Sequence, residues 1–230
     1  AADRGELQSA AGRRAQLERM LADPRARGGV HALVRDWLGV FDNALATKSA
    51  GVLDGTPEDL PASAETSFDR TVDHHLLARG DGLMSLLSSP TTFADASLAP
   101  VLGLSPSDAP QELDTEIRRG LITHPLVVAA HSKEDGASPF VLGAFINEAI
   151  LCRPIAPPPP VLPDPEHQEG ETLRQKLEAL TQEPACQACH AQIGPPGFAL
   201  LPFDPIGRYH PEDGAGRPCD TRGTIEVDAA

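Results

Sequence analysis

The sequence predicts a mainly α-helical protein, with an N-terminal helical domain joined by a proline strap to a C-terminal segment rich in loops. Three observations support this class. Apolar residues recur at helical spacing through much of the chain, aromatic residues make up only 4% of it, and seven prolines lie between Pro154 and Pro165. Few aromatic residues leave the packing to Leu, Val, Ile and Ala, a composition that suits helices.

The proline strap divides the chain. Four of its prolines are consecutive, which favours an extended and semi-rigid polyproline II conformation. We expect a helical domain over residues 1–116 and a connecting helical segment over 117–153. A polyproline linker over 154–170 then leads to a functional segment over 171–230.

Two helices and a loop are expected at the start of the chain. Residues 5–22 carry apolar side chains at roughly helical intervals, and residues 30–41 repeat them at i, i+3 and i+4. The second stripe contains Trp37, which we expect in the core. Residues 48–66 have few large apolar side chains and many Gly, Pro, Asp and Ser, so they predict a loop.

The middle of the chain is less regular. A third helix is expected from Ser67, broken at Gly80-Asp81-Gly82 and resumed up to Ser89-Pro90, and an irregular connector is expected over 91–116. Residues 121–128 are apolar and β-branched. They fit a short strand or a buried helix, because periodicity does not separate the two.

Three further features lead to the functional segment. Ser138-Pro139 predicts a helix start, since a capping hydroxyl precedes a proline in the first turn. Leu173, Leu177 and Leu180 mark a short helix. After His190 the sequence is rich in Gly and Pro, which predicts loops.

The chain is acidic, with a formal net charge of −14 and 40% hydrophobic residues. Such a surface repels nucleic acid and anionic lipid, and it favours a partner with a basic docking surface. No stretch approaches the roughly 18 apolar residues of a membrane span. The chain starts at Ala1 with polar, helix-like sequence, so we expect a mature or trimmed product.

The functional motif is Cys186-Gln187-Ala188-Cys189-His190, a C-x-x-C-H sequence typical of covalent c-type haem attachment. The two thiols can add across the two vinyl groups of one porphyrin, and the adjacent His190 can bind the iron as the proximal ligand. We therefore expect one haem c, held by Cys186, Cys189 and His190.

Two alternatives for the motif remain. A redox C-x-x-C normally has a βαβ context, and none is visible here. A zinc site needs a second ligand pair, for which only the distant Cys152 and Cys219 are left. Haem c is attached outside the cytoplasm, so we expect an exported, periplasmic or extracellular protein. That compartment permits a Cys152–Cys219 disulfide, with two buried thiols as the alternative.

The second axial position of the iron has several candidate ligands. Met20 and Met84 lie on apolar helical stripes, where methionine usually fills gaps in a core. His131 is our preferred distal ligand, because the polar run after it predicts a turn from which the ring can project inward. His124 is the next candidate, and a pair seven residues apart would share one face of a helix.

Three more residues are expected near the haem. Phe198 and Phe203 are predicted to pack on the porphyrin, with general core packing as the alternative. Arg208 fits a haem propionate, since a guanidinium group matches carboxylate geometry, and it fits a salt bridge to Asp204 equally well.

The C-terminal motifs carry a family resemblance. The stretch Cys186–Pro195, with Gly197-Phe198-Ala199-Leu200 and Ile206-Gly207-Arg208-Tyr209, resembles the end of the planctomycete-type cytochrome c family. Residues 119–123, 138–139 and 148–154 resemble its segment before the proline strap, and parts of residues 20–99 resemble its N-terminal helical domain.

The resemblance has departures and implications. The family usually has Met-Asp where this chain has Ile193-Gly194, and Glu-Asn where it has Leu201-Pro202. Family members usually continue past this C-terminus, so the resemblance is compatible with a chain that is part of a longer protein. The resemblance implies export and a covalent haem c, whereas the activity of the family is largely unassigned.

These observations favour one-electron transfer, as a carrier or as a subunit of a larger redox assembly. No G-x-S-x-G elbow, P-loop or dinucleotide fingerprint is present, so electron transfer is favoured over catalysis. A haem enzyme or gas binder with an open iron position is the first alternative. A structural subunit stabilised by its haem is the second.

Overall fold

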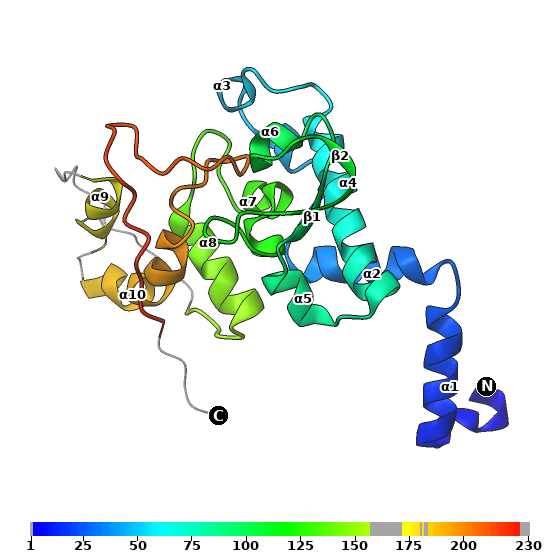
Figure 1. The fold of residues 1–230 in the computed structure, drawn as a ribbon. Coiled ribbons are helices and arrows are strands. Elements are labelled where there is room, and N and C mark those ends of the chain that lie inside the picture. Colours follow the sequence, from blue (N-terminus) through cyan, green and yellow to red (C-terminus); the bar gives the residue numbers. More distant parts are fainter. Residues whose placement is uncertain (1, 157–171, 180, 182–183, 226–230) are drawn as a thin grey trace.

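The structure is a computed structural model that describes residues 2–156, 172–179, 181 and 184–225. Helices dominate it, and the described residues form one small sheet of two strands (Figure 1). The mainly α-helical class is therefore confirmed. From residue 157 onward, the predicted polyproline linker over 154–170 lies outside the described residues.

The first helix, α1 (Ala10–Leu21), projects away from the rest of the molecule (Figure 1). Two short 3-10 turns, Ala2–Arg4 and Glu6–Gln8, precede it. The Ser9 hydroxyl caps the helix by accepting a hydrogen bond from the Gly12 amide at 3.0 Å. No residue of α1 is buried, so this helix contributes little to the core.

Both methionines are exposed. Met20 in α1 is 57% exposed, and Met84 in α5 (Leu83–Ser88) is 70% exposed. The expectation that they fill gaps in a core is therefore wrong. Leu17 and Leu21 in α1 and Leu83 in α5 are also more than half exposed, so the surroundings of both methionines lie on the surface.

Helix α2 (Ala26–Trp37) carries the second predicted stripe, with Val34 fully buried. Trp37 is half-buried, and its indole N–H donates to the Ala149 carbonyl at 2.8 Å. This contact ties the end of α2 to a segment more than one hundred residues later. The expected core position of Trp37 is thus partly realised.

Helix α4 (Leu60–Val72) begins inside the predicted loop over 48–66. A 3-10 turn, Leu45–Thr47, and the short α3 (Ala50–Leu53) come before it, so the loop prediction is wrong over much of its length. Three fully buried side chains four residues apart explain the helix: Leu60, Ala64 and Phe68. Such an i, i+4 period buries one helical face even in polar sequence.

The predicted break at Gly80-Asp81-Gly82 is confirmed. Beyond α4 the chain makes a π-helical turn, Asp73–Arg79, and stops at Gly80, whose φ of 68° is left-handed. Glycine adopts that conformation without the steric cost that other residues meet. Helix α5 (Leu83–Ser88) then forms the second part of the predicted interrupted helix.

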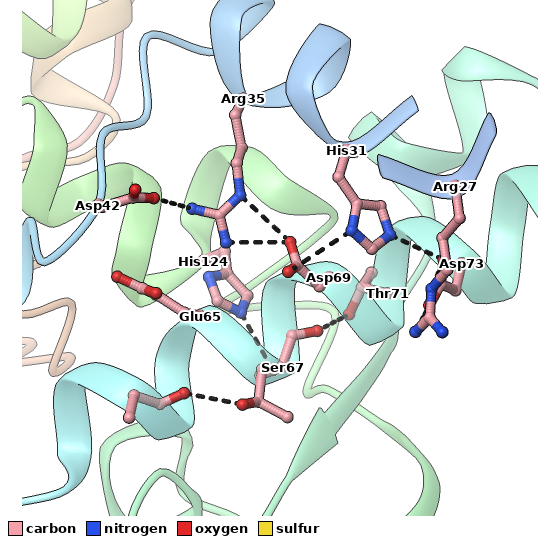
Figure 2. A network of polar contacts seen from close by, with 12 residues as sticks. Arg27, His31, Arg35, Asp42, Glu65, Ser67, Asp69, Thr71, Asp73 and His124 are labelled. Atoms are coloured by element: carbon pink, nitrogen blue, oxygen red, sulfur yellow. Dashed lines mark hydrogen bonds and ion pairs between the residues drawn. The ribbon is translucent and has the colours of Figure 1, made fainter. Parts of the chain in front are cut away.

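Charged side chains join α2 to α4 (Figure 2). His31 lies between two carboxylates, with Nε2 2.8 Å from Asp73 and Nδ1 3.5 Å from Asp69. Arg35 reaches Asp69 from Nη2 at 3.0 Å, and Arg27 pairs with Asp73. The side chains of His31 and Arg35 are only 15% and 16% exposed, so water screens this network less than a surface pair.

A two-stranded antiparallel sheet lies in the predicted irregular connector over 91–116. Strand β1 (Thr91–Ala94) pairs with β2 (Ser107–Glu112), with Thr91 opposite Glu112 and Ala94 opposite Ser107. The short helix α6 (Ala99–Leu102) lies between them. The connector prediction is therefore wrong for these three elements.

The ambiguous stretch 121–128 is helical. It forms a 3-10 turn, Leu121–Thr123, and then α7 (Pro125–Ala130). Helix α8 (Pro139–Phe145) starts where Ser138-Pro139 predicted, and a π-helical turn, Ile146–Ile150, extends it. Helices α9 (Leu173–Ala179) and α10 (Pro184–Phe198) follow in the C-terminal part.

Two apolar cores organise these elements. The larger one draws on α2, α4, α5 and α7 and also includes Ile206, which is fully buried beyond α10. The smaller one contains Val128, Leu142, Leu200 and Phe203. Helices α8 and α10 lie side by side (Figure 1), and α8 contributes Leu142 to the smaller core and Phe145 to the larger one. Among the described helices, none combines the length and the apolar character that a membrane crossing requires.

Candidate haem site

Helix α10 carries the whole C-x-x-C-H motif in its first half. An α-helix turns by about 100° per residue, so Cys186, Cys189 and His190 lie within an arc of roughly 100°. All three are half-buried, and both thiols are free. One face of α10 therefore presents two accessible sulfurs and an imidazole together.

The helix continues beyond the motif in spite of Pro195 and Pro196 in its interior. Because proline has no amide proton, Pro196 leaves the Gln192 carbonyl without its usual helical donor. Asn147 supplies that donor: its side-chain Nδ2 donates to the Gln192 carbonyl at 3.0 Å. The loops predicted to follow the motif directly therefore begin only after residue 198, and that prediction is wrong over residues 191–198.

Helix α8 crosses α10 at backbone contact. A Cβ added to Gly143 would lie 1.8 Å from the Ile193 carbonyl oxygen, and one added to Gly197 would lie 1.9 Å from that of Pro139. Real Cβ atoms do not approach so closely, so only glycine fits at these two positions. The two glycines allow the close approach of the helices. This approach determines which side chains of α8 lie beside the motif.

A cavity of about 310 Å³ opens next to His190. This volume is at the lower end of the range of about 300–1,000 Å³ common for ligand pockets. Its aromatic side is formed by His190, Phe140 and Phe198, and Arg174 from α9 lines its polar side. The imidazole therefore lines a partly apolar cavity, whereas Cys186 and Cys189 are not among its lining residues.

The His190 ring is held by aromatic packing. Phe140 contacts it edge to face, with ring centroids 4.2 Å apart and planes at 75°. Phe198 packs against Phe140 at 5.9 Å, and the Arg174 guanidinium lies 4.7 Å from the Phe198 ring centroid. These four side chains form one continuous stack along the cavity.

The state of His190 suits a metal ligand. Burial lowers the pKa of its imidazole, which favours the neutral form that binds metals. Its Nδ1 atom is buried and has no hydrogen-bond partner among residues 2–156, 172–179, 181 and 184–225. A neutral imidazole beside two free thiols fits the donor set of a c-type haem.

The other residues predicted near the haem divide into two groups. Phe198 lines the cavity, but Phe203 lies in the smaller core, with the Arg118 guanidinium 4.8 Å from its ring centroid. Arg208 pairs with Asp204 at 2.6 Å and donates to the Val52 carbonyl at 2.8 Å. Of the two readings left open for Arg208, the structure has the salt bridge.

The two distal-ligand candidates make their contacts in the larger core. His124 is 4% exposed, its Nδ1 accepts from the Leu126 amide at 3.2 Å, and its Nε2 lies 3.1 Å from the Ser67 hydroxyl. His131 stacks on Phe145 and donates from Nε2 to the Leu38 carbonyl at 2.8 Å. Neither ring shares the cavity beside His190.

The remaining two cysteines are both free. Cys152 is exposed and has a left-handed φ of 54°, and Cys219 is half-buried with its thiol 3.8 Å from the His210 carbonyl. The disulfide considered from the sequence is therefore not formed. Within the described residues, no group of three or more His, Cys, Asp and Glu side chains is arranged to hold a metal ion.

Sequence reasoning missed Phe140, Asn147 and Arg174. Phe140 and Asn147 lie in and just after α8, so only the crossing of α8 on α10 brings them to the motif. Their spacing of seven residues was a usable signal, since it places both on one helical face. Arg174 lies on the short predicted helix before the motif, and its position over Phe198 follows from tertiary packing alone.

Comparisons with known proteins match most of the chain. Residues 1–104 match the family model PSD4, a protein of unknown function (DUF1592), and residues 118–213 match PSCyt3, a protein of unknown function (DUF1588). No curated protein matches the chain, and no solved structure does. Each model matches less than half of the chain, so the likeness is to two domains of unknown function that are associated with planctomycete-type cytochromes c.

Proposed function

We propose that this protein binds one c-type haem covalently on α10 and acts in one-electron transfer, as a carrier or as a subunit of a larger redox assembly. The observation that carries the proposal is the shared helical face of Cys186, Cys189 and His190 on α10, of which His190 lines a partly apolar cavity. In this proposal the two thiols add across the vinyl groups, each sulfur forming a thioether bond while its proton goes to the neighbouring carbon.

The residues of the chain have separate roles in this proposal. The haem would supply the one-electron couple of its iron. His190 binds the iron as a neutral imidazole, and Phe140 and Phe198 shield one side of the site from water. The acidic surface, at a net charge of −14, favours a redox partner with a basic docking surface. Attachment implies export to the periplasm or beyond the cell.

Haem attachment is tested by expressing the protein in a bacterial periplasm together with a cytochrome c maturation system. We expect the intact mass to increase by one haem and the haem to survive denaturing electrophoresis. Cys186→Ala with Cys189→Ala should abolish both signals. The matched control replaces Cys152 and Cys219 by alanine, which should leave them unchanged. An unmodified mass in the matured wild type would overturn the proposal.

The second axial position decides between electron transfer and ligand chemistry. We propose His131 as the distal ligand, for which its ring must leave the Leu38 carbonyl and the stacked Phe145 in the larger core and move to the cavity beside His190. Because His131 and His124 both contact the larger core, a haem enzyme or gas binder with an open iron position is the second candidate function.

An optical and EPR comparison separates the two functions. A low-spin reduced spectrum that carbon monoxide does not change supports electron transfer, and a spectrum that shifts with carbon monoxide supports an open site. His131→Ala should convert low-spin iron to high-spin iron if His131 is the ligand. If the low-spin signal persists in this variant, the assignment of His131 is wrong.

A further inference from the structure

The crossing of α8 on α10 determines the surroundings of His190. Gly143 and Gly197 allow the two backbones to touch, since a Cβ on either glycine would overlap a carbonyl of the opposite helix. Asn147 completes the crossing with its hydrogen bond to the Gln192 carbonyl. Helix α8 is therefore fixed against α10 over its whole length, and Phe140 in its first turn is fixed with it.

Phe140 is the side chain that α8 places on the imidazole. Its ring lies 4.2 Å from that of His190 at 75°, and its other neighbour in the stack is Phe198. Edge-to-face aromatic pairs have a preferred geometry and stabilise it beyond the apolar area that they bury. The contact can therefore hold the imidazole in one orientation.

Within the described part of the chain, no hydrogen bond secures the orientation of the His190 ring. In most metal sites the second ring nitrogen of a ligating histidine donates to a carbonyl, a carboxylate or water, and that bond fixes the ring. Here Nδ1 of His190 is buried, and none of the described residues pairs with it. Packing against Phe140 is therefore the contact that can fix the orientation of the His190 ring.

We infer that Phe140 is a positioning residue that sets the ring plane of His190 for iron ligation. The inference rests on the proposed haem function and adds a residue to it that the C-x-x-C-H motif does not contain. Phe140 itself touches neither the thiols nor the iron in this account. Its effect passes through the imidazole, so it should change the electronic signature of the iron rather than the attachment of the haem.

The test compares Phe140→Leu, which keeps an apolar side chain but removes the ring, with Phe140→Tyr, which keeps the ring. Phe93→Leu is the matched control, because Phe93 is a buried phenylalanine in β1, remote from α10 in the sequence and in its contacts. If Phe140→Leu does not fold, Phe140→Met replaces it as a ring-free variant of similar volume.

We expect all folded variants to gain the mass of one haem. Phe140→Leu should shift the ferric EPR g values and the midpoint potential, and it should broaden the EPR signal. Phe140→Tyr should keep all three quantities close to their wild-type values. Phe93→Leu should leave all three unchanged. In haem-free protein, the ring-current shift of the His190 ring protons should be lost in Phe140→Leu alone.

The outcomes distinguish the inference from the proposed function. Haem attached with unchanged EPR and potential in Phe140→Leu overturns the positioning role and leaves the haem function standing. Equal changes in Phe140→Leu and Phe93→Leu mean a general loss of packing and also overturn it. Absence of haem from the matured wild type overturns the proposed function, and the inference with it.

Discussion

Asn147 is a single side chain on which α10 depends. It is 2% exposed, and its Nδ2 donates both to the Gly143 carbonyl at 2.9 Å and to the Gln192 carbonyl at 3.0 Å. The second bond replaces the donor that Pro196 cannot provide. A buried carbonyl without a partner costs free energy, so the amide of Asn147 stabilises a proline-containing helix.

Asn147→Leu should therefore lower the free energy of unfolding by about 1–3 kcal/mol, because it leaves the Gln192 carbonyl without a donor while keeping the branched shape of the side chain. The measurement is urea unfolding followed by circular dichroism. Gln192→Ala is the control: its side chain is exposed and its carbonyl remains, so its effect should stay within about 0.5 kcal/mol. Equal stability of Asn147→Leu and wild type would show that α10 tolerates its prolines unaided.

At the scale of residues, the sequence was sufficient where the chemistry is local. Cys186, Cys189 and His190 lie within five positions, so any helix brings them together. Arg208 had two equally good partners in the sequence, and the choice of Asp204 depends on a turn in which the Asp204 carboxylate also accepts the Arg208 backbone amide at 2.9 Å. The seven-residue spacing places Phe140 and Asn147 on one helical face, but it does not show that this face meets α10.

The packing of α8 on α10 is the element-scale feature on which the site depends. Gly143→Ala should destabilise the protein by about 1–3 kcal/mol or more, since its Cβ would lie 1.8 Å from the Ile193 carbonyl and the helices must move apart. Thermal unfolding of the purified protein measures the loss. The imidazole environment of His190 should change as well, because Phe140 moves with α8.

Gly28→Ala is the matched control for this change. Gly28 lies inside α2, and a Cβ added there meets nothing within 4 Å. Alanine in an unobstructed helical position should stabilise the fold by about 0.4–1 kcal/mol. Opposite signs for the two Gly→Ala changes support the close crossing, whereas a neutral Gly143→Ala would contradict it.

Other elements show why some local predictions failed. Strand β2 contains Pro110 and two acidic residues, so its sequence has little β-propensity. Its structure comes from pairing with β1 and from Arg70, which donates to the Asp108 carbonyl. Helix α4 was missed at its start because its buried residues are widely spaced among polar ones. In both cases tertiary contacts outweigh local preference.

At the scale of the molecule, the larger core connects parts of the chain that the sequence suggested separating. It joins Val34 of α2 and Leu126 of α7 with Ile206 beyond the motif. The C-terminal part is therefore anchored in the same core as the N-terminal helices. The sequence predicted the helical class, because apolar periodicity is local, but it could not show which buried faces meet.

Buried histidines should make the stability of the whole fold depend on pH. Burial, and secondly the positive charge of Arg118, lower the pKa of His124 to about 3, and burial lowers the pKa of His131 and His190. In the unfolded chain a histidine has a pKa of about 6.5. Between these values the unfolded state binds more protons than the folded state, so protonation favours unfolding.

The stabilising contribution of a neutral His124 is therefore complete above about pH 6.5 and is lost as the pH falls toward about 3. His124 should contribute up to about 1.4 kcal/mol per pH unit to the change of the free energy of unfolding with pH. Urea unfolding across this window measures it. Carboxylates cannot cause an early decline, because Asp and Glu titrate near pH 4 in unfolded chains and lower in ion pairs.

His124→Gln should flatten the slope by about one proton below pH 6.5, although it also weakens the bond to Ser67 and lowers stability at neutral pH. The control is Ser67→Ala, which removes the same hydrogen bond without removing a titratable group, so stability at neutral pH should fall while its dependence on pH remains. A wild-type stability that stays constant from about pH 7 to about pH 5 would contradict the assignment, because a buried neutral imidazole must lose free energy relative to the unfolded chain there.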